Sequence, residues 1–156
     1  MTQNHSDIRT RFIFDDMPIR GMHIRLEKVW HHIVNQKHYP VAIRRALGEL
    51  LAAGSLLSAN LKNEGTLIVQ VQGQGRLKML VVEATSENTV RATARWDENA
   101  EIHDDESLTA LLGENSVFVL THQPKDADPW QGVVPLEGDS IAQMLVNYMK
   151  RSEQLD

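Results

Sequence analysis

Apolar and polar residues alternate along the first part of the chain in a way that predicts a β-hairpin. Residues 9–14 and 19–25 are the two alternating segments, and residues 15–18 form the turn between them. The spacing then changes to three and four, which predicts a helix. Its apolar stripe is Leu26, Val29, Trp30, Ile33 and Val34. Residues 38–40 end this helix, and Pro40 is suited to open the next one.

The strongest pattern is a long helix over residues 41–61. Its apolar stripe is Ile43, Leu47, Leu50, Gly54, Leu57 and Leu61, and small residues crowd positions 52–59. A glycine in mid-helix costs about 1 kcal/mol relative to alanine, so we expect another element to pack closely against Gly54. Gly65 is predicted to be the stop signal for this helix.

From Thr66 onward the period is two, which predicts a central antiparallel sheet. Leu67, Val69 and Val71 alternate with Ile68, Gln70 and Gln72. Residues 73–75 form a turn, after which a second strand returns. On the returning strand the pattern predicts one apolar face of Leu77, Met79 and Val81. Residues 89–96 continue the sheet, with Val90, Ala92, Ala94 and Trp96 on one face.

The last third of the chain predicts two helices and two strands. A short helix over residues 107–113 has a serine at its start and ends at a glycine. Strands are predicted at 117–121 and 130–136. Asp139 is the expected cap of a final helix, whose stripe is Ile141, Met144, Leu145 and Tyr148.

These elements predict an α+β fold. About seven strands form antiparallel sheets, packed with one long helix rich in small residues and about three further helices, and strands do not alternate strictly with helices. A chain of 156 residues fits one domain, so we expect residues 1–156 to form a single one.

Composition excludes several classes of site. The chain has no cysteine, which removes disulfides, thiolate zinc sites and cysteine nucleophiles. Residues 1–5 lack the pattern of a signal peptide, and no apolar run approaches the ~20 residues that span a bilayer. We therefore expect a cytoplasmic protein that does not insert into membranes.

The net charge of −5 is unevenly distributed. Residues 1–62 carry nine Lys/Arg and five Asp/Glu, whereas residues 63–156 carry seven and sixteen. The acidic total argues against nucleic acid as a partner, since nonspecific affinity for it comes from clustered basic residues. Six carboxylates lie within residues 97–106, where a solvated loop or a docking site for a basic partner are the alternatives.

No motif predicts a catalytic, cofactor or metal site. His23, His31, His32 and His38 lack the spacing of three or four that lets two imidazoles share an ion on one helix. The two glycines at 73 and 75 precede a strand, which favours a hairpin turn over a phosphate loop. Five methionines suggest either core filling or an adaptable surface for partners. These are Met17, Met22, Met79, Met144 and Met149.

Four collinear segments resemble the core domain of heat-shock protein 33, an oxidation-activated chaperone family of the bacterial cytoplasm. They are residues 56–62, 65–75, 131–138 and 148–154, and residues 11–14 and 19–21 also fit. The chain departs from the family pattern at three positions: Asn63 replaces an aromatic residue, Arg76 a common proline and Trp130 the usual tyrosine.

The resemblance implies an ATP-independent holdase core, not an enzyme, that binds unfolding proteins and prevents their aggregation. In the family, a C-terminal four-cysteine zinc domain loses its metal on oxidation, and the protein then exposes apolar surface and dimerises. No zinc ligand can be assigned here, so we expect no cofactor in this chain and a fragment of a longer protein. Clients, and a second copy of the chain, are the expected partners. The client-binding residues stay unassigned.

Two other functions remain open from the residues alone. A small hydrolase or transferase using Asp and His would need a histidine–carboxylate pair in a pocket. A docking module using residues 97–106 would bind a basic partner in a salt-sensitive way.

Overall fold

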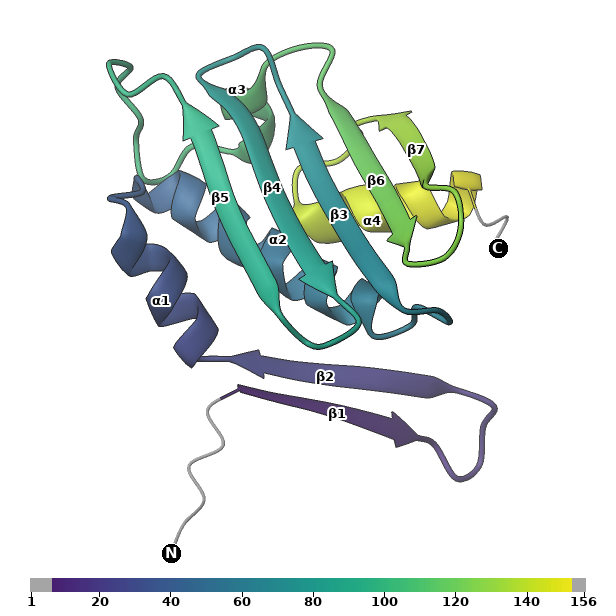
Figure 1. Cartoon of the computed structure of the whole chain (residues 1–156). Coiled ribbons are helices and arrows are strands. Elements are labelled where there is room, and N and C mark those ends of the chain that lie inside the picture. The colour runs from purple at the N-terminus through teal and green to yellow at the C-terminus, as the bar shows by residue number, and fades with distance from the viewer. Residues whose placement is uncertain (1–6, 153–156) are drawn as a thin grey trace, which may run out of the picture.

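Seven strands in two antiparallel sheets and four helices make up residues 7–152, the part of the chain that the computed structural model describes (Figure 1). The predicted α+β class is confirmed. In chain order the elements are β1 (Asp7–Ile13), β2 (Arg20–Leu26), α1 (Lys28–Gln36), α2 (Val41–Ser58), β3 (Gly65–Gln72), β4 (Leu77–Thr85), β5 (Val90–Trp96), α3 (Leu108–Leu112), β6 (Val117–Pro124), β7 (Trp130–Pro135) and α4 (Ile141–Ser152).

The larger sheet has the strand order β5-β4-β3-β6-β7, and α2 and α4 cover one of its faces (Figure 1). Alternate side chains of β3 point toward these helices, and Leu67, Val69 and Val71 are buried as the period of two predicts. Helix α2 supplies the other half of the core through Ile43, Leu47, Leu50 and Leu51. The opposite face of the sheet carries no helix (Figure 1).

Helix α2 lies close to the sheet because its middle is small. A Cβ placed on Gly54 would stand 2.8 Å from Val82 Cγ1, so the expectation that an element packs against this glycine is confirmed. The predicted end of the helix is wrong, because α2 ends at Ser58 and Leu61 lies beyond it. Gly65 is the first residue of β3 instead of a helix stop. Its Cβ would lie 2.4 Å from the Gln123 carbonyl oxygen, so close pairing with β6 explains this glycine.

Strand β4 contains an irregularity that the alternation did not reveal. Its pairing with β5 shifts register between Leu77 and Met79. After the shift, Leu80 and Val82 point into the core while Met79 and Val81 are only half-buried. The prediction that Leu77, Met79 and Val81 share one buried face is therefore wrong.

The turn at residues 73–75 packs against the end of α3. The backbone N–H groups of Gln74 and Gly75 donate to the Leu112 carbonyl at 3.0 and 2.7 Å. A Cβ on Gly75 would stand 2.4 Å from the Leu111 carbonyl oxygen, so the close approach of two backbones requires glycine. The hairpin turn is confirmed, and these donors are committed to a protein acceptor.

Both C-terminal helices begin at a serine. Ser107 Oγ accepts from Ala110 N at 3.2 Å and caps α3, as predicted. At α4, Ser140 Oγ accepts from Gln143 N at 3.2 Å, so Ser140 is the cap and the prediction of Asp139 is wrong. The α4 stripe is confirmed, with Ile141, Met144 and Tyr148 buried. Residues 153 and 154 of the C-terminal motif lie outside the described residues.

The N-terminal hairpin is confirmed as a separate two-stranded sheet of β1 and β2. It extends along one end of the larger sheet in Figure 1. Leu26 belongs to β2 rather than to the first helix, which begins at Lys28. Asp7 explains this start, because its Oδ1 accepts from Lys28 N at 2.9 Å and so satisfies a donor at the helix N-terminus.

Candidate functional site

Exposed apolar side chains gather on the N-terminal hairpin. Nine large hydrophobic residues are exposed among residues 7–152, and six of them lie between residues 8 and 19. We call these six the hairpin patch: Ile8, Phe12, Ile13, Phe14, Met17 and Ile19. Single exposed hydrophobic residues are normal, but six on one short segment, here divided between the two faces of the hairpin, are typical of a surface that contacts another molecule.

The register of the two strands shows how the patch is built. Ile8 pairs with Arg25 and Phe12 with Gly21, and paired residues share one face of the hairpin. The Phe12 ring lies over Gly21, where a Cβ would meet it at 2.1 Å. Phe12 and Phe14 contact edge to face, with ring centroids 5.8 Å apart. Gly21 therefore provides the space that the Phe12 ring occupies.

The other face of the hairpin attaches it to the body of the protein. Met22, Ile24 and Leu26 are half-buried on this side. Arg11 reaches past the end of α2, where its Nη2 donates to the Ala59 carbonyl at 2.7 Å. A few half-buried side chains, this bond and the Asp7 contact to α1 hold the hairpin in place.

The hairpin also has unpaired backbone. Within residues 7–152, β1 pairs with β2 alone, and neither strand joins the five-stranded sheet. An open strand edge presents a row of N–H and C=O groups that can pair with an extended polypeptide. Apolar side chains and free backbone groups together suit a segment of unfolded chain better than a small polar substrate.

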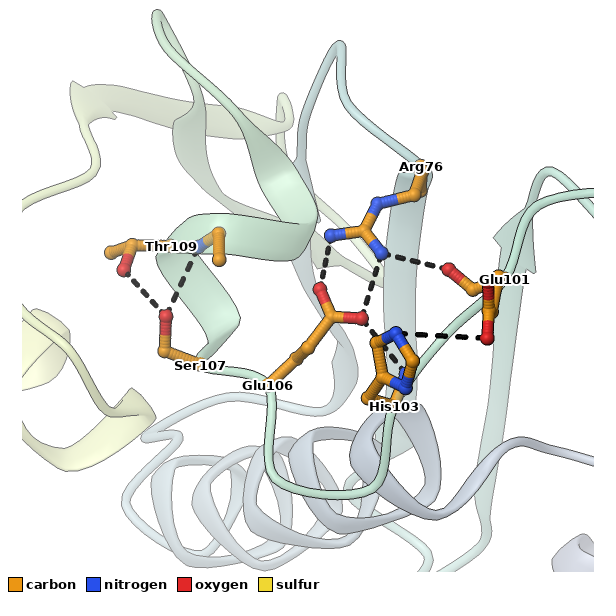
Figure 2. A network of polar contacts seen from close by, with 7 residues as sticks. Arg76, Glu101, His103, Glu106, Ser107 and Thr109 are labelled. Atoms are coloured by element: carbon orange, nitrogen blue, oxygen red, sulfur yellow. Dashed lines mark hydrogen bonds and ion pairs between the residues drawn. The ribbon is translucent and has the colours of Figure 1, made fainter.

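Arg76 and Glu106 form the most strongly perturbed charge pair of the described residues (Figure 2). Both guanidinium ends of Arg76 donate to the Glu106 carboxylate, one of them at 2.7 Å, and the backbone N–H of His103 donates to the same carboxylate at 2.8 Å. These two donors, the guanidinium first, lower the pKa of Glu106 to about 2. The hydrogen bond to Glu106 also raises the pKa of Arg76.

This pair changes the interpretation of the acidic segment. The Glu106 side chain is 14 % exposed, so one of the six carboxylates is an internal anchor and not part of a solvated surface. Arg76 also donates to the Glu101 carbonyl at 2.8 Å, which ties the segment to the β3–β4 turn. Lys37 pairs with Glu98 at 2.9 Å. Arg76 and Lys37 thus neutralise part of the negative charge of residues 97–106.

Among the histidines within residues 7–152, only His103 forms an ion pair with a carboxylate, and that pair is exposed. His103 Nε2 lies 3.7 Å from Glu101 Oε1, but both side chains are more than half exposed, and the contact lies on an open loop. His32 instead contacts Gln36 at 2.8 Å on α1. No group of three or more metal-ligating side chains comes together within residues 7–152.

The methionines divide between the two alternatives that the sequence offered. Met144 is 2 % exposed and fills the core, and Met22, Met79 and Met149 are half-buried. Met17 is 48 % exposed and belongs to the hairpin patch.

The sequence contained a further signal for the hairpin patch. Phe12, Ile13 and Phe14 are consecutive, so a strand cannot turn all three to one face.

None of the helices formed by the described residues is both long enough and apolar enough to cross a membrane.

Comparisons with known proteins agree with this fold. The family model described as Hsp33 protein matches residues 7–156. The chain is 83 % identical over 153 residues to the 33 kDa chaperonin of Neisseria meningitidis serogroup A and 50 % identical over 158 residues to that of Chromobacterium violaceum. These matches cover 98 % and 100 % of this chain, but 51 % and 53 % of the relatives.

A solved structure has the same fold. It is the crystal structure of the 33 kDa chaperonin, a heat shock protein 33 homolog, from Thermotoga maritima. The match has a TM-score of 0.82 at 23 % sequence identity and covers 97 % of this chain and 52 % of that one. The chain thus spans about half the length of the relatives that it matches.

Proposed function

The chain belongs to the Hsp33 family, and we propose that it forms the client-binding core of an ATP-independent holdase, with the hairpin patch as its contact surface for unfolding proteins. A holdase binds its clients through apolar surface, and this surface must be exposed without ATP hydrolysis. The observation that carries the proposal is that six of the nine exposed large hydrophobic residues among residues 7–152 lie on this one hairpin.

We propose that a client segment adds to the hairpin as a further strand and packs its apolar side chains against the hairpin patch. An unfolding protein exposes apolar side chains and unsatisfied backbone groups together. The edge of β1 can pair with the backbone, while Ile8, Phe12 and Phe14 cover alternate side chains. Hydrophobic contact of this kind does not depend on sequence, which suits a protein with many clients.

The remaining parts of the proposal follow the family. We propose that residues 1–156 act as one non-enzymatic domain, in the cytoplasm, as a monomer or homodimer. The chain has no cysteine, so its own residues do not fit the four-thiolate zinc site that the family implies, and no redox step is assigned to it. A response to oxidation through disulfide chemistry would need cysteines that this chain does not have.

Light scattering of a thermally unfolding client tests the proposal. The wild-type chain at several-fold excess should suppress aggregation. The double variant Phe12→Ser, Ile13→Ser should lose most of that suppression, because a few central apolar residues carry most of a contact surface. Val146→Ser is the matched control, since Val146 is a comparably exposed apolar residue on α4. It should suppress aggregation as the wild type does.

Two results would contradict the proposal. The holdase function fails if the wild-type chain leaves client aggregation unchanged at every ratio. The assignment to the hairpin fails if the double variant and the control behave alike. Suppression that disappears with added salt would instead favour the docking function of residues 97–106, since screening weakens charge contacts and not apolar ones.

A further inference from the structure

The free edge of β1 has side chains of two kinds, one kind on each face of the hairpin. Strand β2 lies between β1 and the larger sheet (Figure 1), and every residue of β1 is exposed. Residues at successive positions of a strand point to opposite faces. Phe12 lies on the outer face, whereas Arg9 and Arg11 are opposite Ile24 and Met22 on the face toward the body.

The two arginines carry positive charge that the described part of the chain does not neutralise. Neither Arg9 nor Arg11 forms an ion pair among residues 7–152. The Arg11 guanidinium donates to the Ala59 carbonyl, which is an uncharged acceptor. The Asp7 carboxylate on the same strand instead accepts from the backbone N–H at the start of α1. The inner face of β1 is therefore a basic strip beside an open strand edge.

A segment that pairs with β1 would place its own side chains beside both faces. Directly opposite residues of paired strands have Cβ atoms about 4.5–5.5 Å apart, and opposite charges at such positions attract each other. Alternate side chains of the added segment would lie beside Phe12 on the outer face. The side chains between them would lie beside Arg9 and Arg11. Apolar residues suit the first set of positions, and carboxylates suit the second.

We propose that the free edge of β1 selects extended client segments in which apolar residues alternate with acidic ones. Amphipathic strands of unfolding antiparallel sheets have this pattern. The preference rests on the proposed function, because it takes the hairpin patch as the contact surface and adds a ranking among clients. It is opposite to what the whole chain predicts, since a net charge of −5 by itself favours a basic peptide.

Amide NMR titration with three peptides tests this preference. Each peptide has seven residues, the length of β1, with valine at alternate positions and glutamate, serine or lysine between them. We expect the glutamate peptide to bind about fivefold more tightly than the serine peptide, because it gains two pairs of opposite charges. The lysine peptide should bind most weakly. The largest shifts should lie in β1 for all three peptides, and added salt should reduce the differences between them.

Substitutions on the two strands of the hairpin assign the preference to the edge of β1. Arg9→Gln should reduce the preference for glutamate over serine to about twofold, since one of the two charge pairs is lost, and should leave the serine peptide unchanged. Arg20→Gln is the matched control. Arg20 is opposite Ile13 on the same face and loses the same charge, but β1 separates it from the added segment. This variant should keep the wild-type preference.

The possible failures are distinguishable. Equal affinity for the glutamate and lysine peptides, with shifts in β1, would overturn the acidic preference and leave the contact surface intact. Equal losses of preference in Arg9→Gln and Arg20→Gln would show only general charge attraction and would reject pairing beside Arg9. If none of the three peptides shifted β1, the proposed function of the hairpin would be contradicted together with the preference.

Discussion

The body of the protein and its N-terminal hairpin differ in how far their side chains are buried. The five-stranded sheet and α2 share a core in which many side chains are fully buried, whereas every residue of β1 is exposed. An isolated two-stranded hairpin is marginally stable in water. The hairpin therefore depends on the body for its position, and the body does not depend on the hairpin for its core.

This difference separates stability from binding. Elements that bind partners are commonly drawn from the less stable parts of a protein, because apolar surface kept free for a partner contributes little to the protein's own core. The hairpin can keep Phe12 and Phe14 exposed because the body has enough buried apolar area without them. Substitutions in the two regions should therefore have different effects on stability.

Truncating one large side chain in each region should give the largest contrast. Leu50 on α2 is fully buried, and Leu50→Ala should lower the free energy of unfolding by about 2–5 kcal/mol through lost burial and a cavity. Phe12 is 43 % exposed, and Phe12→Ala should cost less than about 1 kcal/mol. Urea denaturation followed by circular dichroism measures both. Equal losses would mean that the hairpin belongs to the cooperative core.

The sequence predicted the body in more detail than the exposure of the hairpin, for a physical reason. Periodicity reports which side chains face a core, so the β3 face of Leu67, Val69 and Val71 and the packing against Gly54 could be predicted. Local irregularities leave the average pattern unchanged. The register shift after Leu77 and the choice of Ser140 as the cap of α4 were missed for this reason.

The candidate site was harder to predict because it exists only where no other element of the protein covers the hairpin. Alternation in residues 9–14 predicted a strand, but the sequence could not show that β1 would lack a second partner strand. The position of the hairpin depends on long-range contacts. The bond from Arg11 to Ala59 spans 48 residues of the sequence, and the contact from Asp7 to α1 spans 21. No local pattern encodes such pairs.

Removing the Arg11 contact should loosen the hairpin and leave the body unchanged. Arg11→Gln removes a charged hydrogen bond of 2.7 Å to the Ala59 carbonyl. We expect amide hydrogen exchange in β1 and β2 to become about tenfold faster, corresponding to roughly 1.4 kcal/mol of local opening free energy. Exchange in β3 and β4 should stay the same.

Arg20→Gln provides the control for this experiment, because Arg20 is exposed and makes no ion pair or side-chain hydrogen bond among residues 7–152. It should change exchange in neither region. If Arg11→Gln also accelerated exchange in β3, the two regions would open together, and the separation between them would be wrong.

The last expected effect lies on the body side of the comparison, at Glu106, and it appears only at acidic pH. Its pKa is about 2 in the folded protein and near 4.5 in the unfolded chain, so folding favours the charged carboxylate. The resulting stabilisation is fully present above pH 4.5 and is lost as the pH falls toward 2. Glu106→Gln should therefore flatten the fall in stability between pH 4.5 and 2, measured by urea denaturation at each pH. The Arg11→Gln variant should keep the wild-type slope, because the bond from Arg11 to the Ala59 carbonyl involves no group that titrates in this range. A wild-type slope in Glu106→Gln would mean that the pair with Arg76 does not anchor the acidic segment to the body.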